Sequence, residues 1–198
     1  MKEGKCLILE KRQKTFPVKL LLIALLMITI IGGTTYWIQG MNKVKEQNKA
    51  RQAVSDKVTT VMRMFHCNDL EIHDAIMDTF DPVLIAIIIG VESEYRVNAV
   101  SRAGCRGLMQ LSPDKLDDWK NVRKNIQVGA KYLQDQIQHF GNLELAVAAY
   151  NAGPSSVSKY QGVPPYVETK AYVKKAKLLS LAFDHFLPWT TEQTRQML

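Results

Sequence analysis

The chain has 198 residues, of which 46% are hydrophobic and 23% are charged, a composition that is ordinary for a globular protein. The formal net charge is +7, yet residues 1–58 hold 11 Lys and Arg against 4 Asp and Glu, whereas residues 59–198 hold 15 of each. The basic excess therefore lies wholly in the N-terminal arm. Because the globular part has no net charge with which to attract phosphates, we expect no nucleic-acid partner.

The first predicted element is an apolar helix within residues 18–38. Leu20 to Ile38 contains 19 uncharged, mostly apolar residues, enough for one bilayer crossing. Tyr36 and Trp37 stand where an aromatic belt would hold the far interface. We interpret this segment as a transmembrane anchor; a cleaved signal peptide is the alternative, although no A-x-A-like site follows. Lys and Arg flank the span on both sides, six before it and five after it, so their distribution does not decide the orientation.

The remaining domain organisation follows from shifts in composition. Residues 1–17 form a basic arm, which the anchored topology would make cytoplasmic, and residues 39–57 form a polar stalk without proline that we expect to be helical at its far end. The folded domain is expected over residues 58–187, followed by a C-terminal tail over residues 188–198. Its beginning is marked by apolar residues at helical spacing: Val54, Val58, Val61, Met62 and Phe65.

Capping signals predict the first helices of the folded domain. Asn68 or Asp69 is a candidate N-cap for a short helix that ends near Phe80. Asp81 followed by Pro82 is a strong start for the next helix. This second helix is apolar on all sides, which is typical of a central helix that is buried on most faces.

The rest of the folded domain is predicted to be helical as well, apart from one loop. Residues 95–118 contain turn-forming residues and predict an irregular region. A further helix over residues 126–140 is ended by Gly141, a short apolar helix covers residues 143–150, and the last helix covers residues 167–183. No strand pattern of useful length occurs, so the predicted fold class is all-α.

Few side chains in this sequence suggest chemistry. The four His residues are scattered, and there is no HExxH, paired CxxC, GxSxG, P-loop or GxGxxG motif, so we expect neither a metal nor a cofactor. Glu92 and Glu94 remain, at the end of the apolar run. Residues two positions apart on a helix point in directions about 200° apart around the helix axis, so these two carboxylates cannot act as a pair on one substrate bond. Periodicity alone does not indicate which of the two is a catalytic acid. An equally weighted alternative is that both are solvated acids at the end of a helix, without a catalytic role.

Four blocks from Glu92 onward carry a resemblance. They are "ESEYRVNAVSRAGCRGLMQLSP", "NVRKNIQVGAKYL", "AVAAYNAGPSSVSKY" and "VPPYVETKAYV". In this order and spacing, over residues 80–175, the sequence resembles the soluble lytic transglycosylase family. The resemblance implies a lysozyme-like, mostly helical fold and an enzyme that cleaves the β-1,4 bond between N-acetylmuramic acid and N-acetylglucosamine in peptidoglycan.

The resemblance also assigns roles to individual residues. It implies that Glu92 is the catalytic acid, and that Ser101, Gly104 and Gly107 form a loop that brings the "GLMQ" block beneath it. The implied substrate-binding residues are Ser93, Ser101, Met109, Gln110, Tyr150, Asn151 and Glu168. The sequence departs from the family at Cys105, where a small residue, usually Ala, is expected. It also departs in the stretch "DKLDDWKNVRKN", which is shorter than the usual link of the family. These departures mean that the resemblance does not define the shape of the cleft.

One carboxyl group suffices for the chemistry that the resemblance implies. Burial would raise its pKa and keep it protonated, so that it can donate to the glycosidic oxygen. The 6-hydroxyl of muramic acid then attacks within the same sugar, giving a 1,6-anhydro ring without a second carboxylate. Two alternatives stay open. One is a goose-type muramidase that positions water with Asp114, Asp117 or Asp118, and the other is an inactive wall-binding anchor of an envelope machine.

The resemblance also bears on location and partners. Murein lies outside the inner membrane, so residues 39–198 are expected in the periplasm, held by a single-pass anchor in the inner membrane. An anchored domain of this kind suggests local wall opening for a secretion or conjugation apparatus, a pilus or a phage. Cys67 and Cys105 would share the oxidising side and could form a disulfide; two unrelated buried thiols are the alternative.

Overall fold

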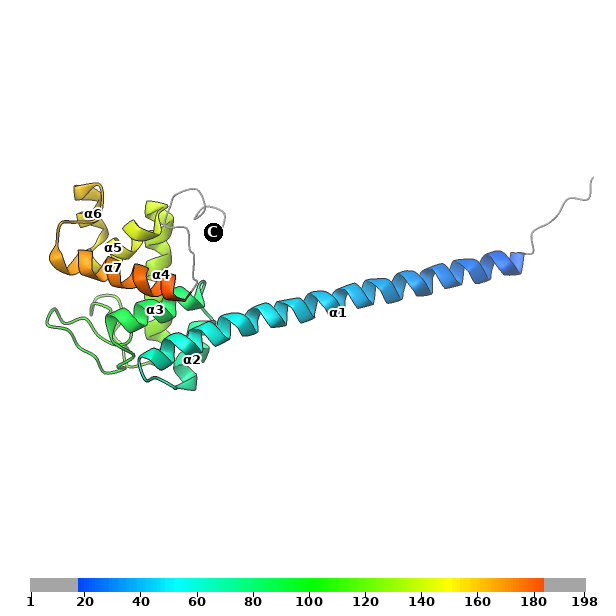
Figure 1. Cartoon of the computed structure of the whole chain (residues 1–198), viewed down its shortest axis with the longest axis horizontal. Helices are drawn as coiled ribbons and strands as arrows, with labels where there is room; N and C mark the ends of the chain where they lie inside the picture. Colours follow the sequence, from blue (N-terminus) through cyan, green and yellow to red (C-terminus); the bar gives the residue numbers. More distant parts are fainter. Residues whose placement is uncertain (1–17, 184–198) are drawn as a thin grey trace, which may run out of the picture. The chain divides into compact units, whose positions relative to one another are not determined.

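The computed structural model describes residues 18–183, over which the chain forms helices joined by short loops and one longer irregular region (Figure 1). The helices are α1 (Val18–Met64), α2 (Leu70–Met77), α3 (Pro82–Glu92), α4 (Val122–Phe140), α5 (Leu143–Ala152), α6 (Pro154–Tyr160) and α7 (Val167–Ala182). Over the same range, extended pairing is limited to isolated bridges around Arg106. The all-α prediction is therefore confirmed for residues 18–183. The predicted basic arm over residues 1–17 and the C-terminal tail over residues 188–198 lie outside the described residues.

The chain divides into two compact units, residues 1–49 and 50–198. The described part of the first unit belongs entirely to α1, and its large apolar side chains are exposed, for example Leu20 at 57% and Ile28 at 65%. This part of α1 is long and apolar enough to cross a membrane, judged by length and composition. The stalk over residues 39–57 is helical throughout, not only at its far end.

Several helix boundaries of the second unit lie at the predicted signals. The Asp69 carboxylate caps α2 by accepting backbone N–H bonds of 2.8 and 3.2 Å, and the Asp81 carboxylate caps α3 in the same way at 3.1 Å, followed by Pro82 in the first turn. Such caps satisfy N–H groups that have no partner within the helix. Gly141 ends α4 in the left-handed conformation, with φ of 59°, which glycine adopts without steric cost.

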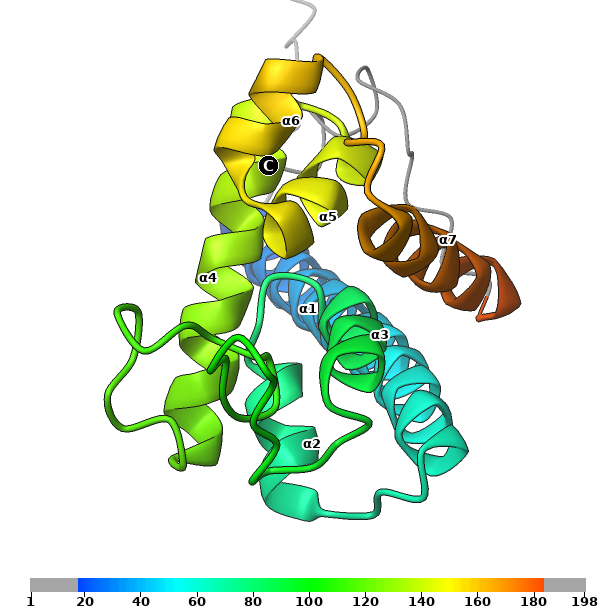
Figure 2. The same cartoon turned by 90° about the vertical axis from the view of Figure 1, so that its left-hand side faces the viewer.

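Helix α3 forms the centre of the second unit. All residues from Val83 to Gly90 are buried, and the helix packs against α2 and α7 (Figure 2). A Cβ atom at Gly90 would collide with the ring of Phe65, so this position needs glycine for the turn after α1 to pack closely. Burial of these aliphatic side chains contributes to the hydrophobic stabilisation of the fold, together with the buried residues of the surrounding helices.

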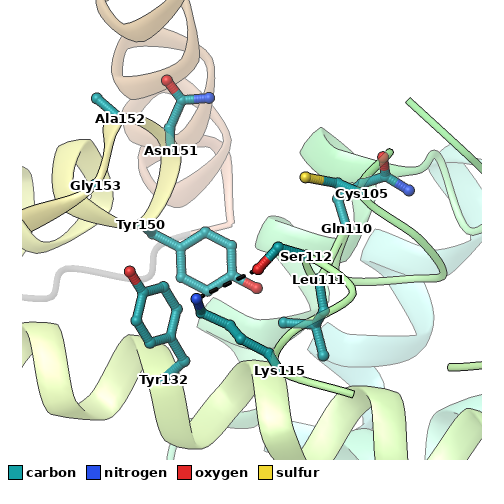
Figure 3. Close-up of a pocket in the computed structure, with 10 residues that line it drawn as sticks. All are labelled: Cys105, Gln110, Leu111, Ser112, Lys115, Tyr132, Tyr150, Asn151, Ala152 and Gly153. Atoms are coloured by element: carbon teal, nitrogen blue, oxygen red, sulfur yellow. Dashed lines mark hydrogen bonds between the residues drawn. The ribbon is translucent and has the colours of Figure 1, made fainter. Parts of the chain in front are cut away.

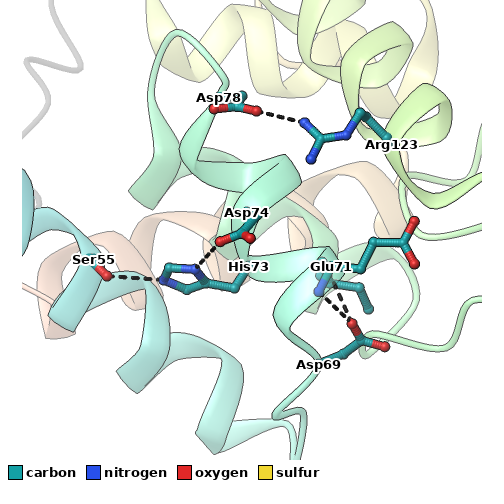
Figure 4. A network of polar contacts seen from close by, with 8 residues as sticks. Ser55, Asp69, Glu71, His73, Asp74, Asp78 and Arg123 are labelled. Carbon is teal, nitrogen blue, oxygen red and sulfur yellow. Dashed lines mark hydrogen bonds and ion pairs between the residues drawn. The ribbon is translucent and has the colours of Figure 1, made fainter.

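A polar network joins α2 to its neighbours within the second unit (Figure 4). Ser55 Oγ on α1 lies 3.1 Å from His73 Nε2 on α2, and Arg123 Nη1 on α4 donates to Asp78 Oδ2 at 2.6 Å. These contacts are partly or fully exposed, so they align the helices more than they stabilise them.

Helix α6 is the element that the sequence pattern did not predict. The "NAGP" stretch does end α5, but Gly153, with φ of 83°, redirects the chain and Pro154 opens a new helix. Proline suits a first helical turn, where its missing N–H would have no partner. By contrast, residues 95–118 contain turns and isolated bridges without a helix, as predicted.

Candidate active site

The end of α3 opens into a cavity of about 450 Å³. Glu92 is the last residue of α3, and the irregular loop, the end of α5 and the first turn of α7 supply the other walls. The residues that line this cavity are Glu92, Ser101, Arg102, Ala103, Cys105, Gln110, Tyr150, Asn151 and Glu168.

Glu92 is the most perturbed carboxyl group of this cavity. Its side chain is half-buried, and Oε1 accepts a hydrogen bond of 2.6 Å from the Tyr172 hydroxyl. Burial raises the pKa of Glu92 to about 7; the Tyr172 hydrogen bond opposes this rise, and the negative charge of Glu168 adds to it. Burial dominates because it disfavours the charged form of a carboxyl group. Both protonation states are thus populated near neutral pH.

Glu94 has a different environment, although it lies only two positions away. Helix α3 ends at Glu92, and both Glu94 and Tyr95 adopt positive φ angles, of 52° and 64°. This sharp turn leaves Glu94 exposed and folds Tyr95 back, so that its hydroxyl donates to the Ala86 carbonyl at 2.8 Å. The structure therefore singles out Glu92 as the half-buried acid, a choice that helical periodicity left open.

Ser93 and Met109 do not reach the cavity, contrary to the expectation from sequence. Ser93 is fully buried, and its hydroxyl donates to the Ile89 carbonyl at 3.3 Å. Met109 is also fully buried, with its side chain against Gly129, where a Cβ would lie 2.5 Å from its sulfur. The two side chains are packing residues behind the site, because the turn after α3 and the fold of the "GLMQ" block direct them inward.

The backbone of Met109 nevertheless helps to build the cavity wall. Its carbonyl accepts the Tyr150 hydroxyl at 2.8 Å, and its N–H donates to Asn125 Oδ1 at 2.9 Å. Gln110 follows with φ of 47°, and its side-chain amide donates to the carbonyls of Gly107 and Ala99 at 2.9 and 3.2 Å. The irregular loop is thus tied to α4 and α5 by directional hydrogen bonds rather than by a sheet.

The remaining predicted residues come together at the cavity. Ser101, Gln110, Tyr150, Asn151 and Glu168 all line it. Asn151 Oδ1 accepts a hydrogen bond of 2.8 Å from the hydroxyl of Thr169, which is buried in the first turn of α7. This contact fixes the end of α5 against the helix that carries Glu168.

Tyr172 is the residue that the sequence reasoning missed. It lies 80 positions after Glu92, on α7, and four after Glu168. Residues four apart share a helix face, so Tyr172 could have been placed beside Glu168 from its spacing in "VETKAYV". Its contact with Glu92 could not have been found in this way, because it depends on how α3 and α7 pack.

The three acids considered for positioning water are absent from the lining of the Glu92 cavity. Asp114, Asp117 and Asp118 are exposed on the irregular loop. Asp118 accepts a hydrogen bond from Lys124 at 2.8 Å, and Asp114 lies 3.7 Å from Lys115. The second carboxylate in this cavity is Glu168 instead.

The predicted Cys67–Cys105 disulfide is not formed, and both residues are free thiols. Cys67 lines a pocket with residues from α1 and α2, whereas Cys105 lines the Glu92 cavity. The expected pairing is corrected accordingly, because the fold assigns the two thiols to different pockets.

A second cavity of about 310 Å³ adjoins the first (Figure 3). The two share Cys105, Gln110, Tyr150 and Asn151, and the second extends toward α4 with Tyr132 and Lys115. We refer to these two adjoining cavities together as the groove; Glu92 lines one of them.

Comparison with known families identifies the class of this domain. The model of the "Transglycosylase SLT domain" family matches residues 69–173, which include Glu92, the helices α2 to α6 and the first part of α7. The chain therefore belongs to this family, as the four sequence blocks predicted, and its all-α architecture is the one that the resemblance implied.

Individual relatives agree with this assignment. The soluble lytic murein transglycosylase of Salmonella typhimurium is 30% identical over 125 aligned positions, covering 48% of this chain and 19% of the relative. A transglycosylase of Enterobacteria phage PRD1 is 28% identical over 117 positions, covering 56% of this chain and 42% of the relative. The chain thus spans about a fifth of the first relative and less than half of the second.

Two solved structures of lytic transglycosylases are also similar to this chain. An inactive mutant of the lytic transglycosylase Slt from Pseudomonas aeruginosa has 27% identity and a TM-score of 0.47, covering 55% of this chain and 23% of that one. The 70 kDa soluble lytic transglycosylase from Escherichia coli has 25% identity and a TM-score of 0.48, covering 59% of this chain and 23% of that one.

Proposed function

We propose that this protein is a membrane-anchored peptidoglycan lytic transglycosylase that cleaves the β-1,4 bond between N-acetylmuramic acid and N-acetylglucosamine. The observation that carries the proposal is the state of Glu92, a half-buried acid whose pKa is raised to about 7 at the wall of a 450 Å³ cavity. A general acid works best when its pKa lies near the operating pH. The same group can then serve as a base once it has given up its proton.

In this mechanism, Glu92 acts twice. Protonated Glu92 donates to the glycosidic oxygen while the bond to the anomeric carbon of muramic acid breaks, and N-acetylglucosamine leaves as an alcohol. The 6-hydroxyl oxygen of the same muramic acid bonds to that carbon, and the Glu92 carboxylate takes the hydroxyl proton. The acid is restored and a 1,6-anhydro ring is formed. Attack within one sugar has a high effective concentration, so no protein nucleophile is needed.

The neighbouring side chains have supporting roles. Tyr172 donates to Oε1, which holds the carboxyl group and leaves its other oxygen for the substrate. The charge of Glu168 raises the pKa of Glu92, so it helps to keep the acid protonated before substrate binds. We assign substrate binding to the polar groups that line the cavity, namely Ser101, Gln110, Tyr150 and Asn151.

Hydrolysis is the competing reaction to test, because Glu168 lies in the same cavity as Glu92. A carboxylate on the opposite side of the scissile bond could activate water, as in inverting glycosidases. The two mechanisms differ in their products. A transglycosylase leaves 1,6-anhydromuramic ends, whereas a muramidase leaves reducing muramic acid.

Mass spectrometry of the products released from purified murein is the decisive experiment. We expect anhydro ends from the wild type and from Glu168→Gln, and no release by Glu92→Gln. Reducing ends that disappear in Glu168→Gln would establish a muramidase. Failure of the wild type to clear murein at all would instead support an inactive wall-binding anchor.

The location of the protein is part of this proposal. We assign residues 18–38 to a single-pass anchor in the inner membrane and residues 1–17 to the cytoplasm. The stalk over residues 39–57 then holds the catalytic domain, residues 58–187, in the periplasm with the tail over residues 188–198. The exposed apolar side chains of α1 support the anchor, and the murein substrate requires the periplasmic side.

An anchored enzyme would open the wall locally rather than degrade it throughout. A relative from phage PRD1 is named a transglycosylase. This supports a role for the protein in opening the wall for an envelope-crossing apparatus, such as that of a phage, a pilus, or a secretion or conjugation system. Co-purification of the full chain with such a machine from the producing cell, compared with the chain lacking residues 18–38, would test this assignment.

A further inference from the structure

The part of the groove next to the Glu92 cavity has a charge pattern of its own. Among the residues that the structure describes, ten line it, and Lys115 is the only one of these with a charged side chain. The Glu92 cavity, in contrast, contains Glu92 and Glu168 together with Arg102. The second cavity is therefore lined by a cationic side chain and no carboxylate, although it shares a wall with the cavity that holds both glutamates.

Lys115 is held at this cavity by its neighbours (Figure 3). Its Nζ atom donates to Ser112 Oγ at 3.4 Å and lies 4.7 Å from the centre of the Tyr132 ring. The Tyr132 ring in turn packs against Tyr150, with 5.4 Å between the ring centres. An ammonium group above an aromatic face is attracted by the ring electrons, so the charge stays beside the groove.

The carboxylate of Asp114 lies near Lys115, but it does not form a close hydrogen bond with the ammonium group. Asp114 Oδ2 lies 3.7 Å from Nζ, beyond a good hydrogen bond, and its side chain is 76% exposed while that of Lys115 is 32% exposed. Solvent screens a pair of this kind strongly. Asp114 does not line the cavity, so the ammonium group remains able to bind an anion there.

The chemistry of murein indicates which anion this is. Its sugars carry neutral N-acetyl groups, and its carboxylates lie on the peptide stems attached to the lactyl group of muramic acid. A strand placed for cleavage at Glu92 would carry such a stem within the same groove. A charged donor that meets a carboxylate away from bulk water forms a strong, selective hydrogen bond.

We propose that Lys115 is a specificity-determining residue that binds a carboxylate of the murein peptide stem in the cavity beside Glu92. The inference rests on the proposed function, because it takes murein as the substrate. The stretch after "GLMQLSP" places Lys115 over Tyr132, which would make the wall of the groove selective for peptide-bearing strands.

A binding experiment tests the proposal independently of catalysis. The full chain with Glu92→Gln would be titrated with soluble peptide-bearing murein strands and with the same strands stripped of their stems by an amidase, which leaves a free lactyl carboxylate. Adding Lys115→Met, which retains a long apolar side chain, is expected to weaken binding of peptide-bearing strands about tenfold and to abolish the preference over stripped strands. Lys115→Arg should retain the preference.

Lys120→Met provides the matched control. Lys120 is an exposed lysine near an aromatic ring, with Nζ 5.5 Å from the centre of the Trp119 ring, but it does not line the cavity, so its removal should leave the preference unchanged. An equal loss for both kinds of strand in Lys115→Met would overturn the proposal in favour of a packing role, and a loss confined to the stripped strands would overturn it in favour of the lactyl carboxylate. Unchanged binding would overturn it as well. If the parent chain binds neither kind of strand, the proposed function fails together with the choice of murein as ligand.

Discussion

The chain contains two strongly apolar helical segments whose surroundings are opposite. The segment over residues 20–38 in α1 exposes its apolar side chains in the structure, whereas the core of α3, from Val83 to Gly90, is buried. Both are rich in Ile and Leu, so composition does not separate them. They differ in what covers them: α3 is enclosed by the helices of its own unit, and we propose that lipid covers the segment in α1.

The consequence of this difference lies at the end of each segment. A lipid-covered helix ends at the water interface, where Tyr36 and Trp37 are well suited. A protein-covered helix can end at an internal surface, and α3 ends on Glu92, whose pKa is raised by that burial. Burial of the apolar helix α3 therefore sets the pKa of its last residue, and under the proposed function the exposed apolar segment of α1 determines where the reaction takes place.

Deletion of residues 18–38 is expected to produce the largest effect, a complete change of location. The intact chain should stay in the membrane pellet after carbonate extraction, and the deleted chain should be soluble while retaining activity on purified murein. If the intact chain is instead released as a shortened soluble protein, the segment is a signal peptide and the proposed contrast with α3 fails.

Glu92→Gln should lower the rate of murein cleavage by about 10⁴-fold or more, because it retains the shape of the side chain but removes the proton of a group used as both acid and base. The measurement is the release of soluble fragments over time. Glu94→Gln is the matched control, since Glu94 is exposed beyond the end of α3. Near-normal activity in Glu92→Gln would rule out the mechanism.

Removing a side chain from α3 should cost stability where the same change in α1 does not. Ile88 is fully buried and Ile28 is 65% exposed, so Ile88→Ala should lower the free energy of unfolding of the catalytic domain by about 2–5 kcal/mol. Ile28→Ala should leave it unchanged within error. Denaturant titration followed by circular dichroism measures both. Equal losses of unfolding free energy in the two variants would mean that the segment in α1 is buried in the folded protein as α3 is, contrary to the proposed difference.

The raised pKa of Glu92 predicts a pH-dependent loss of stability. The folded-state pKa of about 7 lies above the ordinary value of 4.5, so the unfolded chain loses this proton at lower pH than the folded chain. The contribution of this group is therefore fully favourable below about pH 4.5 and is lost as the pH rises through about 7, at a cost of about 3 kcal/mol. Glu92→Gln should remove this dependence and be more stable than the wild type at about pH 8. Parallel pH curves for the two proteins would contradict the raised pKa.

Tyr172→Phe should have the smallest effect, a decrease in activity of about tenfold. The Tyr172 hydrogen bond lowers the pKa of Glu92 against the effect of burial. Its loss should therefore raise this pKa further and move the alkaline limb of the pH–rate profile to higher pH. A lower rate without any shift of the limb would mean that Tyr172 acts only on packing.

Much of this protein could be predicted from local sequence. Asp81 with Pro82 begins α3 and Gly141 ends α4, because caps and left-handed turns depend on residues a few positions apart. The long apolar segment in α1 and the all-α class follow from periodicity, which is also local. The family was recognisable because its motifs are short and occur in a fixed order, so Glu92 could be named as the candidate acid without a structure.

Tertiary packing decided what the local pattern left open. The preference for Glu92 over Glu94 depends on the turn after α3, and the Glu92–Tyr172 hydrogen bond joins positions 80 apart. Packing also buried Ser93 and Met109 behind the site and left Cys67 and Cys105 in different pockets. The physical reason is the same in each case. Burial, and with it the pKa of a carboxyl group, is set by neighbours that are distant in sequence, and a linear pattern contains no information about their distances.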